Sequence, residues 1–310
     1  MERYPRDSFK IATKLPMPKV NSAEDNEKLF NEELEKCGVE YFDYYLLHAM
    51  NSERFEKAKK YGSFEFLKKM KAEGKIRHIG FSFHDDVKLL EEMLTLWPET
   101  EFVQLQINYI DWENPSIQAK ECYDLCTKLG KPVIVMEPIK GGSLVDIPQE
   151  AEKLFKDYAP DASVASWAVR YAASLDNVMM VLSGMSNMDH VEDNTSYMEN
   201  FVPLCDDEYK IIDKVVDIIN SSIAIPCTAC GYCVDGCPVG IPIPKYFALY
   251  NADLQALNKG FSTQMTYYTN MTVNLPTASR CIGCGQCESA CPQHLAIIDG
   301  LKLVAERFDK

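Results

Sequence analysis

Short apolar runs recur along the first two thirds of the chain and predict six β-strands. Most of the runs are continuous rather than alternating, which is typical of parallel strands that are buried on both faces. They are FKIATKL, YFDYYLLH, IRHIGFSF, EFVQLQINY, PVIVMEP and VMMVLSG, at residues 9–15, 41–48, 76–83, 101–109, 132–138 and 178–184.

The segments between these runs show the spacing of amphipathic helices. In the first of them, Ser22 and Asp25 have the spacing of a capping box, and Gly38 is placed to end the helix. Two more helices are predicted by apolar residues spaced three or four apart, Val87, Leu90, Leu94 and Trp97 in one and Ala119, Cys122, Cys126 and Leu129 in the other. Asn114-Pro115 is expected to open the latter helix.

Strand and helix signals therefore alternate, and this βα repeat predicts a parallel sheet with right-handed crossovers. Six repeats fit either an open, doubly wound sheet or most of an eight-stranded barrel. The pattern changes after residue 204, which divides the chain into an α/β domain at 1–204 and a smaller domain at 205–310. The smaller domain begins with a predicted amphipathic helix and has another near residues 244–260.

Two cysteine runs lie within the smaller domain, and both read C-x2-C-x2-C-x3-C-P. The first run contains Cys227, Cys230, Cys233 and Cys237, and the second contains Cys281, Cys284, Cys287 and Cys291. Bacterial ferredoxins use this run to bind 4Fe–4S clusters, each of which needs four thiolates. Zinc sites usually show two C-x2-C pairs instead, so zinc is the weaker interpretation. We expect two clusters and a domain that depends on them for folding.

Resemblance to two-cluster ferredoxins also implies how the ligands are shared. In those proteins the fourth cysteine of each run serves the cluster of the other run. The first cluster would then be held by Cys227, Cys230, Cys233 and Cys291, and the second by Cys281, Cys284, Cys287 and Cys237.

Charge and composition narrow the class of partner. The 310-residue chain has a formal net charge of −14 and a pI near 4.9, which argues against binding to nucleic acid or to anionic lipid. No run of 18 apolar residues is present, so we expect no membrane span. Oxygen-sensitive clusters and free thiols favour a reducing cytoplasm.

Residues 9–200 resemble the aldo-keto reductases, in particular the branch that has a C-terminal ferredoxin-like module. Five stretches carry the resemblance: IATKLP, FDYYLLHAM, IRHIGFSFH, VQLQINYID and VLSGMSNMDHVEDN. It implies an active-site lysine and histidine at Lys14 and His48. It further implies nicotinamide contacts at Ser82, Gln104 and Asn108, and contacts to the adenosine end of the cofactor at Gly184, Asp193 and Asn194.

The same resemblance implies a TIM-type barrel that lacks its first two βα units, with the active site at the carboxyl ends of the strands. The family's catalytic tetrad is Asp, Tyr, Lys and His, and only Lys14 and His48 have counterparts in this sequence. We therefore expect the chain to bind clusters but to reduce carbonyls slowly. His84 is interpreted as a residue without a role in the site.

The implied activity is hydride transfer between NADP(H) or NAD(H) and a carbonyl or alcohol substrate, coupled to electron transfer through the clusters. His190 stands where members that select NADP often place arginine, and Glu137 stands where many members stack an aromatic ring on the nicotinamide. A small electron carrier such as a ferredoxin or flavodoxin is the expected protein partner. The alternative is an electron-transfer protein in which the barrel is a scaffold without hydride chemistry.

Overall fold

The structure is a computed structural model that describes residues 3–113, 117–221, 224–227, 229, 231–255, 263–291 and 293–309. The chain divides into two compact units. The first, here called the barrel unit, comprises Met1–Asp146 and Phe155–Ile212. The second, here called the cysteine unit, comprises Ile147–Leu154 and Asp213–Lys310. The predicted opening of a helix at Asn114-Pro115 falls outside the described residues.

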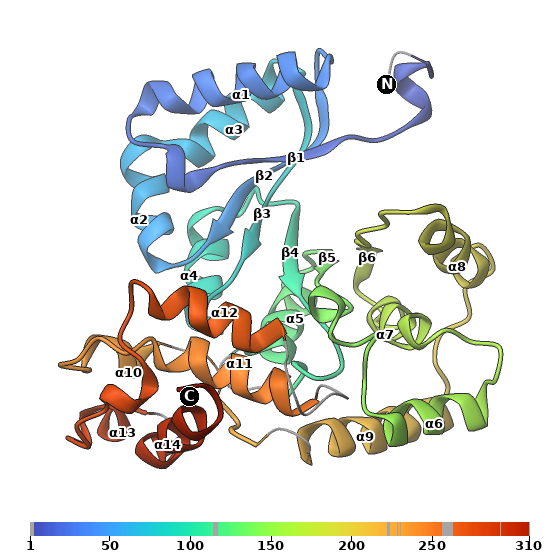
Figure 1. The fold of residues 1–310 in the computed structure, drawn as a ribbon. Coiled ribbons are helices and arrows are strands. Elements are labelled where there is room, and N and C mark those ends of the chain that lie inside the picture. Colours follow the sequence, from blue (N-terminus) through green and yellow to red (C-terminus); the bar gives the residue numbers. More distant parts are fainter. Residues whose placement is uncertain are drawn as a thin grey trace. The chain divides into compact units, whose positions relative to one another are not determined.

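Six parallel strands form the sheet of the barrel unit (Figure 1). Their order in the sheet is the order of the chain, β1 to β6. A doubly wound sheet would reverse direction at a switch point, whereas a barrel adds each strand beside the last. The order therefore confirms the incomplete barrel with about six βα units. The strands are β1 (Ala12–Leu15), β2 (Phe42–Met50), β3 (Ile76–Phe83), β4 (Phe102–Gln106), β5 (Val133–Met136) and β6 (Val178–Val181).

Helices connect successive strands, as the alternating pattern predicts. The capping box of the first helix is formed, since the Ser22 backbone N–H donates to Asp25 at 2.9 Å, and Gly38 ends that helix with a φ of 64°. The helices are α1 (Ala23–Cys37), α2 (Ser52–Tyr61), α3 (Ser63–Ala72), α4 (Val87–Leu96), α5 (Ala119–Lys128), α6 (Gln149–Tyr158), α7 (Val164–Ala173), α8 (Met188–Met198) and α9 (Asp206–Ser221).

The observed elements differ from the predicted ones mainly at their ends. Leu129, expected on the buried face of a helix, follows the last residue of α5 and is 44% exposed. The strand predicted at 101–109 ends at Gln106, because Asn108 turns the chain by accepting backbone hydrogen bonds from Ile110 and Asp111. Local hydrogen bonds of asparagine compete with the strand ladder in this way.

The two faces of the sheet have different partners. On one face, Tyr45 of β2 packs edge-on against Phe30 of α1, with ring centroids 5.0 Å apart. On the other face, Leu46, Phe102 and Ile134 form a separate buried cluster. We call this second face the inner face. Side chains alternate between faces along a strand, so residues two apart share a face.

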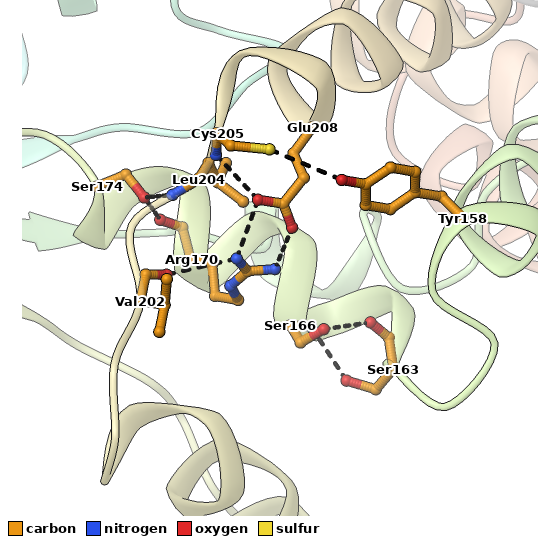
Figure 2. A network of polar contacts seen from close by, with 9 residues as sticks. All are labelled: Tyr158, Ser163, Ser166, Arg170, Ser174, Val202, Leu204, Cys205 and Glu208. Atoms are coloured by element: carbon orange, nitrogen blue, oxygen red, sulfur yellow. Dashed lines mark hydrogen bonds and ion pairs between the residues drawn. The ribbon is translucent and has the colours of Figure 1, made fainter.

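Helix α9 is fixed to α7 by a polar network within the barrel unit (Figure 2). Arg170 of α7 contacts both carboxylate oxygens of Glu208, at 2.7 and 3.2 Å. Glu208 also accepts the backbone N–H of Cys205 at 2.9 Å, which caps the start of α9. A bidentate arginine–carboxylate pair of this kind fixes geometry as well as adding energy.

The cysteine unit is mostly helical, as expected. Its elements are α10 (Tyr232–Asp235), α11 (Ile243–Gln255), α12 (Thr263–Thr272), α13 (Gln286–Ser289) and α14 (Ile297–Phe308). Its core includes Ile241, Tyr246, Phe247, Leu301 and Val304, each nearly without solvent exposure. Of the helix predicted near 244–260, the last five residues lie outside the described residues. Among the helices that the structure describes, none is long and apolar enough to span a bilayer.

Gly80 gives a direct test of the strand packing. A Cβ added at this position would lie 2.4 Å from the backbone oxygen of Phe102 in β4, a contact that no side-chain motion relieves. We expect Gly80→Ala to lower the free energy of unfolding by about 1–3 kcal/mol or more, measured by denaturant titration of the anaerobic protein.

The matched control is Gly184→Ala, because a Cβ at Gly184 meets no atom within 4 Å. Its unfolding free energy should stay within about 0.5 kcal/mol of the parent protein. Equal stability of both variants would show that β3 and β4 do not pack as described.

Candidate active site and cysteine sites

Lys14 and His48 lie on the inner face near the carboxyl ends of neighbouring strands. Lys14 of β1 pairs in register with Leu46 of β2, and His48 follows Leu46 by two residues on the same face. The register continues through Gly80 of β3, which places Ser82 one step further along the same face. The strands thus bring together Lys14, His48 and Ser82, three of the residues that the family resemblance singled out.

Positive charges surround His48. Partial burial lowers the pKa of its imidazole, and the nearby charges of Lys14 and Arg54 lower it further, as does His84. The imidazole is therefore neutral at pH 7, when one ring nitrogen carries a hydrogen and the other does not. Burial also lowers the pKa of the Lys14 ammonium.

The residue after His48 is held in an uncommon backbone conformation. Ala49 has a φ of 54°, in the left-handed region that residues with a side chain seldom occupy. Its N–H donates to the hydroxyl of Ser82 at 2.7 Å, and its carbonyl accepts from the guanidinium of Arg54. Ser82 is fully buried. In this structure Ser82 therefore fixes the end of β2 next to His48.

His84 belongs to the same group of charges, although the sequence assigned it no role. Burial lowers the pKa of its imidazole, Glu137 opposes the shift, and Lys14 and Arg54 add to it. Its backbone N–H donates to Met50 at 3.0 Å, which continues the pairing of β3 with β2. The two-residue spacing from Ser82 was the signal that could have identified it.

A cavity of about 140 Å³ opens beside His84. Phe83 and Leu105, at the ends of β3 and β4, and Ile117, just before α5, give the wall its apolar part. Besides His84, the polar residues in the wall are Asp85 and Gln106. The volume is close to that of apolar cavities that hold a benzene molecule, at about 150 Å³.

Gln104 and Asn108 are both buried, and their amides have partners inside the protein. The Gln104 side chain donates to Met136 at 3.0 Å. The Asn108 amide donates to Asp111 at 2.9 Å, and Lys140 donates to the same carboxylate. This network ties the loops after β4 and β5 to each other at the carboxyl end of the sheet.

Gly184, Asp193 and Asn194 lie after β6 and in α8. The space next to Gly184 is open. Asp193 accepts a hydrogen bond from the hydroxyl of Ser163 at 2.7 Å, and the Asn194 amide donates to Ser183 at 2.9 Å. Ser163 and Asp193 also line a cavity of about 250 Å³ between α7 and α8.

The cysteine unit contains two cavities that combine residues from both cysteine runs. One is lined by Cys227 and Cys233 of the first run and by Cys291 of the second. The other is lined by Cys237 of the first run and by Cys281, Cys284 and Cys287 of the second. Cys230 lies outside the described residues. The fourth cysteine of each run thus faces the cavity of the other run.

Small residues and turns let the backbone wrap each cysteine cavity. Gly231 and Gly285 have φ values of 85° and 75° at the starts of α10 and α13, where each cysteine run turns between two of its cysteines. Apolar side chains complete the walls, with Ile243 shared by both cavities. Cysteines in an apolar wall are the ligand type that an iron–sulfur cluster requires, and the potential of such a cluster depends on burial and on hydrogen bonds to sulfur.

Comparison with known families agrees with this division of the chain. Residues 2–217 match the profile of the aldo/keto reductase family, and residues 226–296 match that of the 4Fe-4S dicluster domain. The chain therefore belongs to the aldo/keto reductase family and continues into a 4Fe–4S dicluster domain. No curated protein matches its sequence.

Solved structures of aldo-keto reductases share the fold. A thermostable aldo-keto reductase in complex with the inhibitor epalrestat superposes with a TM-score of 0.56 at 19% identity, over 69% of this chain and 74% of that one. The holo form of an aldo-keto reductase from Bacillus halodurans gives 0.54 at 23% identity, over 68% and 73%. One from Klebsiella pneumoniae in complex with NADPH gives 0.54 at 19% identity, over 68% and 71%.

The charge of Lys14 should have a measurable effect on the pKa of two imidazoles, those of His48 and His84. In Lys14→Met, the pKa values of both His48 and His84 should rise, because Lys14 lowers each of them. The measurement is a pH titration of the imidazole resonances by NMR. The exposed residue Lys128 at the end of α5 supplies the control Lys128→Met, which should leave both values unchanged.

The lowered pKa of His48 also determines how the stability of the protein changes with pH. A folded-state pKa below the ordinary 6.5 means that the unfolded chain binds the proton first as the pH falls. The parent protein therefore loses stability from about pH 6.5 downwards through the folded pKa, and Lys14→Met should lose less. A steeper acid loss in the variant would contradict this account.

Proposed function

We propose that the protein transfers hydride between NADP(H) or NAD(H) and a small carbonyl or alcohol substrate, and couples this to electron transfer through two 4Fe–4S clusters. The observation that carries the proposal is that Lys14 and a neutral His48 lie near the carboxyl ends of adjacent strands, where the charge of Lys14 lowers the pKa of the imidazole. Active sites of TIM-type barrels lie at this end of the sheet.

The roles of the two residues follow from their charges. A neutral imidazole can donate one hydrogen bond to a carbonyl oxygen and so orient the carbonyl, which fits His48. The Lys14 ammonium favours the negative charge that develops on that oxygen during reduction. A bound nicotinamide supplies the hydride.

The cofactor would lie along the carboxyl end of the sheet. Ser82, Gln104 and Asn108 are proposed for the nicotinamide end, where the first and last of them also fix the loops after β2 and β4. For the adenosine end we propose Gly184, Asp193 and Asn194, and the open space beside Gly184 allows a ligand to approach the backbone.

For the clusters we propose the crossed ligand sets. Cys227, Cys230, Cys233 and Cys291 would hold one cluster, and Cys281, Cys284, Cys287 and Cys237 the other. The two cysteine-lined cavities support this assignment for the seven described cysteines. Bound clusters supply one-electron exchange, and we propose a small electron-carrier protein as partner and the cytoplasm as location.

Hydride transfer is tested with the anaerobically purified holoprotein, NADPH or NADH, and a panel of small aldehydes and ketones. We expect Lys14→Met and His48→Gln each to lower kcat/KM by roughly a hundredfold, because one charge-stabilising or proton-handling group is lost. The readout is the absorbance of the reduced nicotinamide.

His78→Gln is the matched control, since His78 lies on the same face of β3 at its amino end. Its kcat/KM should match that of the parent protein. If no nicotinamide-dependent reduction occurs and the clusters still exchange electrons, the barrel is a scaffold and the proposed hydride chemistry is wrong.

The crossed ligand sets make a separate prediction about iron content. Two 4Fe–4S clusters contain about eight iron atoms. The double variant Cys237→Ser with Cys284→Ser should lose one cluster, whereas Cys237→Ser with Cys227→Ser should lose both. Iron analysis and EPR of the reduced protein distinguish the two cases.

Cys205→Ser is the control, because Cys205 lies at the start of α9 in the barrel unit. It should leave both clusters in place. If instead Cys237→Ser with Cys227→Ser removes only one cluster, each run holds its own cluster and the crossed sets are wrong.

A further inference from the structure

The two cysteine-lined cavities differ in how far their walls reach the solvent. The cavity at Cys227, Cys233 and Cys291 is here called the covered cavity, because the described residues that line it are all buried or half-buried. The cavity at Cys237, Cys281, Cys284 and Cys287 is here called the open cavity. Three residues of its wall are exposed, namely Pro238, Ile282 and Cys284. By the residues described, a redox group in the open cavity therefore lies closer to the surface.

Ile282 is the large apolar side chain that connects the open cavity with the solvent. It lies between Cys281 and Cys284 in the loop of the second run, it forms part of the cavity wall, and it is 68% exposed. Single exposed apolar side chains are common on protein surfaces, so the position of Ile282 at a cluster cavity is the informative feature. Tyr232 of the first run is similarly exposed, at 64%, but it is not among the described residues that line the covered cavity.

Two cations lie next to the second run. Arg280 directly precedes Cys281, is exposed, and forms no ion pair within the described part of the chain. Lys302 of α14 pairs with Asp299 at 2.8 Å, and it is also close enough to Cys281 for the two charges to interact. An exposed pair such as that of Lys302 and Asp299 holds its partners only weakly. Both cations can therefore meet the carboxylates of a partner protein.

The distribution of charge along the chain also favours this unit as the contact for an acidic partner. The whole chain has a formal net charge of −14, yet residues 213–310 contain eight Asp and Glu residues and seven Lys and Arg residues. Nearly all of the negative charge thus belongs to residues 1–212, which repel an acidic protein. Like charges brought together at an interface are costly, so the nearly neutral cysteine unit is the more favourable contact.

We propose that the loop at residues 280–284, together with Pro238 and Lys302, is the docking surface for a small acidic electron carrier of the ferredoxin type. The open cavity then holds the cluster that exchanges electrons with the carrier. Carboxylates of the carrier meet Arg280 and Lys302, and its apolar surface covers Ile282. In each exchange one electron leaves the reduced cluster and the oxidised carrier takes it up, and no bond or proton is transferred. This inference rests on the proposed cluster chemistry for its redox step, but not for binding.

Binding is measured first with both proteins oxidised, so that no electron is transferred. The probe is an acidic two-cluster bacterial ferredoxin, titrated into the anaerobic holoprotein by isothermal titration calorimetry at low salt. We expect a complex whose affinity falls as salt is added, because salt screens exposed charge pairs. Absence of binding at low salt, or an affinity that does not depend on salt, overturns the proposal.

Substitutions of Ile282 test the docking surface through the sign of the charge that they introduce. Ile282→Asp should weaken ferredoxin binding by about tenfold, because it removes an apolar contact and adds repulsion. Ile282→Lys should bind ferredoxin more tightly than Ile282→Asp does, because the new charge is attractive. Tyr232→Asp is the matched control, since Tyr232 is similarly exposed in the first run, and its affinity should equal that of the parent protein. Equal weakening by Ile282→Asp and Tyr232→Asp overturns the assignment.

Arg280→Glu tests the same surface without a change between the cysteines of the run. It should weaken ferredoxin binding by about tenfold, because an attractive charge becomes repulsive. Lys245→Glu is its control, since Lys245 is an exposed cation elsewhere in the cysteine unit, in α11. This pair decides the outcome if the Ile282 variants contain fewer than about eight iron atoms. Ferredoxin affinity that is unchanged in Arg280→Glu overturns the proposal.

Electron transfer then separates this inference from the proposed function. The dithionite-reduced protein is mixed in a stopped-flow instrument with oxidised ferredoxin or with hexaammineruthenium(III), a small cation that needs no docking surface, and the visible absorbance of the clusters is followed. We expect Arg280→Glu to slow the reaction with ferredoxin about tenfold and not to slow the reaction with the ruthenium complex. Unchanged rates with both oxidants overturn the docking surface but leave cluster electron transfer standing. Oxidation by neither, with ferredoxin binding intact, overturns the proposed electron transfer but leaves the docking surface standing.

Discussion

The close approach of β3 and β4 at Gly80 sets the geometry of the barrel unit. The backbone oxygen of Phe102 occupies the space that any side chain at Gly80 would need. With this register fixed, Lys14 lies beside Leu46, Leu46 beside Gly80, and Ser82 beside Gln104. A shift of one residue would turn every one of these side chains to the opposite face. The candidate site at the carboxyl end of the sheet thus depends on a packing contact at Gly80, two residues before Ser82 along β3.

Buried polar residues near the candidate site also hold the backbone of the neighbouring loops in place. Ser82 holds Ala49 in its left-handed conformation, and Asn108 with Asp111 ties together two loops. Backbone strain of this kind persists where the surrounding contacts determine it, and it is common at functional sites. The buried hydroxyl of Ser82, which holds Ala49, therefore also positions the neighbouring His48.

The fold of the cysteine unit is stabilised in a different way from that of the barrel unit. Its helices share a small core around Tyr246 and Phe247, and its two cavities are lined by cysteines from runs that lie far apart in the sequence. Small domains with a limited core commonly depend on a metal for stability. Because each cavity draws cysteines from both runs, bound clusters would join the two halves of the unit, and folding and cluster binding would be linked.

Local patterns in the sequence determined much of this protein. The apolar runs located all six strands, the capping box at Ser22 located α1, and the cysteine spacing identified the cluster module, because each of these signals lies within a few residues. The family resemblance predicted Lys14 and His48 as active-site residues. Tertiary structure alone decided what lies next to them. Arg54 belongs to a helix and His84 follows a strand, and neither has a local motif. His84 reaches His48 because parallel pairing brings the ends of β2 and β3 together. Arg54 does so because the turn from β2 into α2 returns its guanidinium to the carbonyl of Ala49, and charge acts through space rather than along the chain.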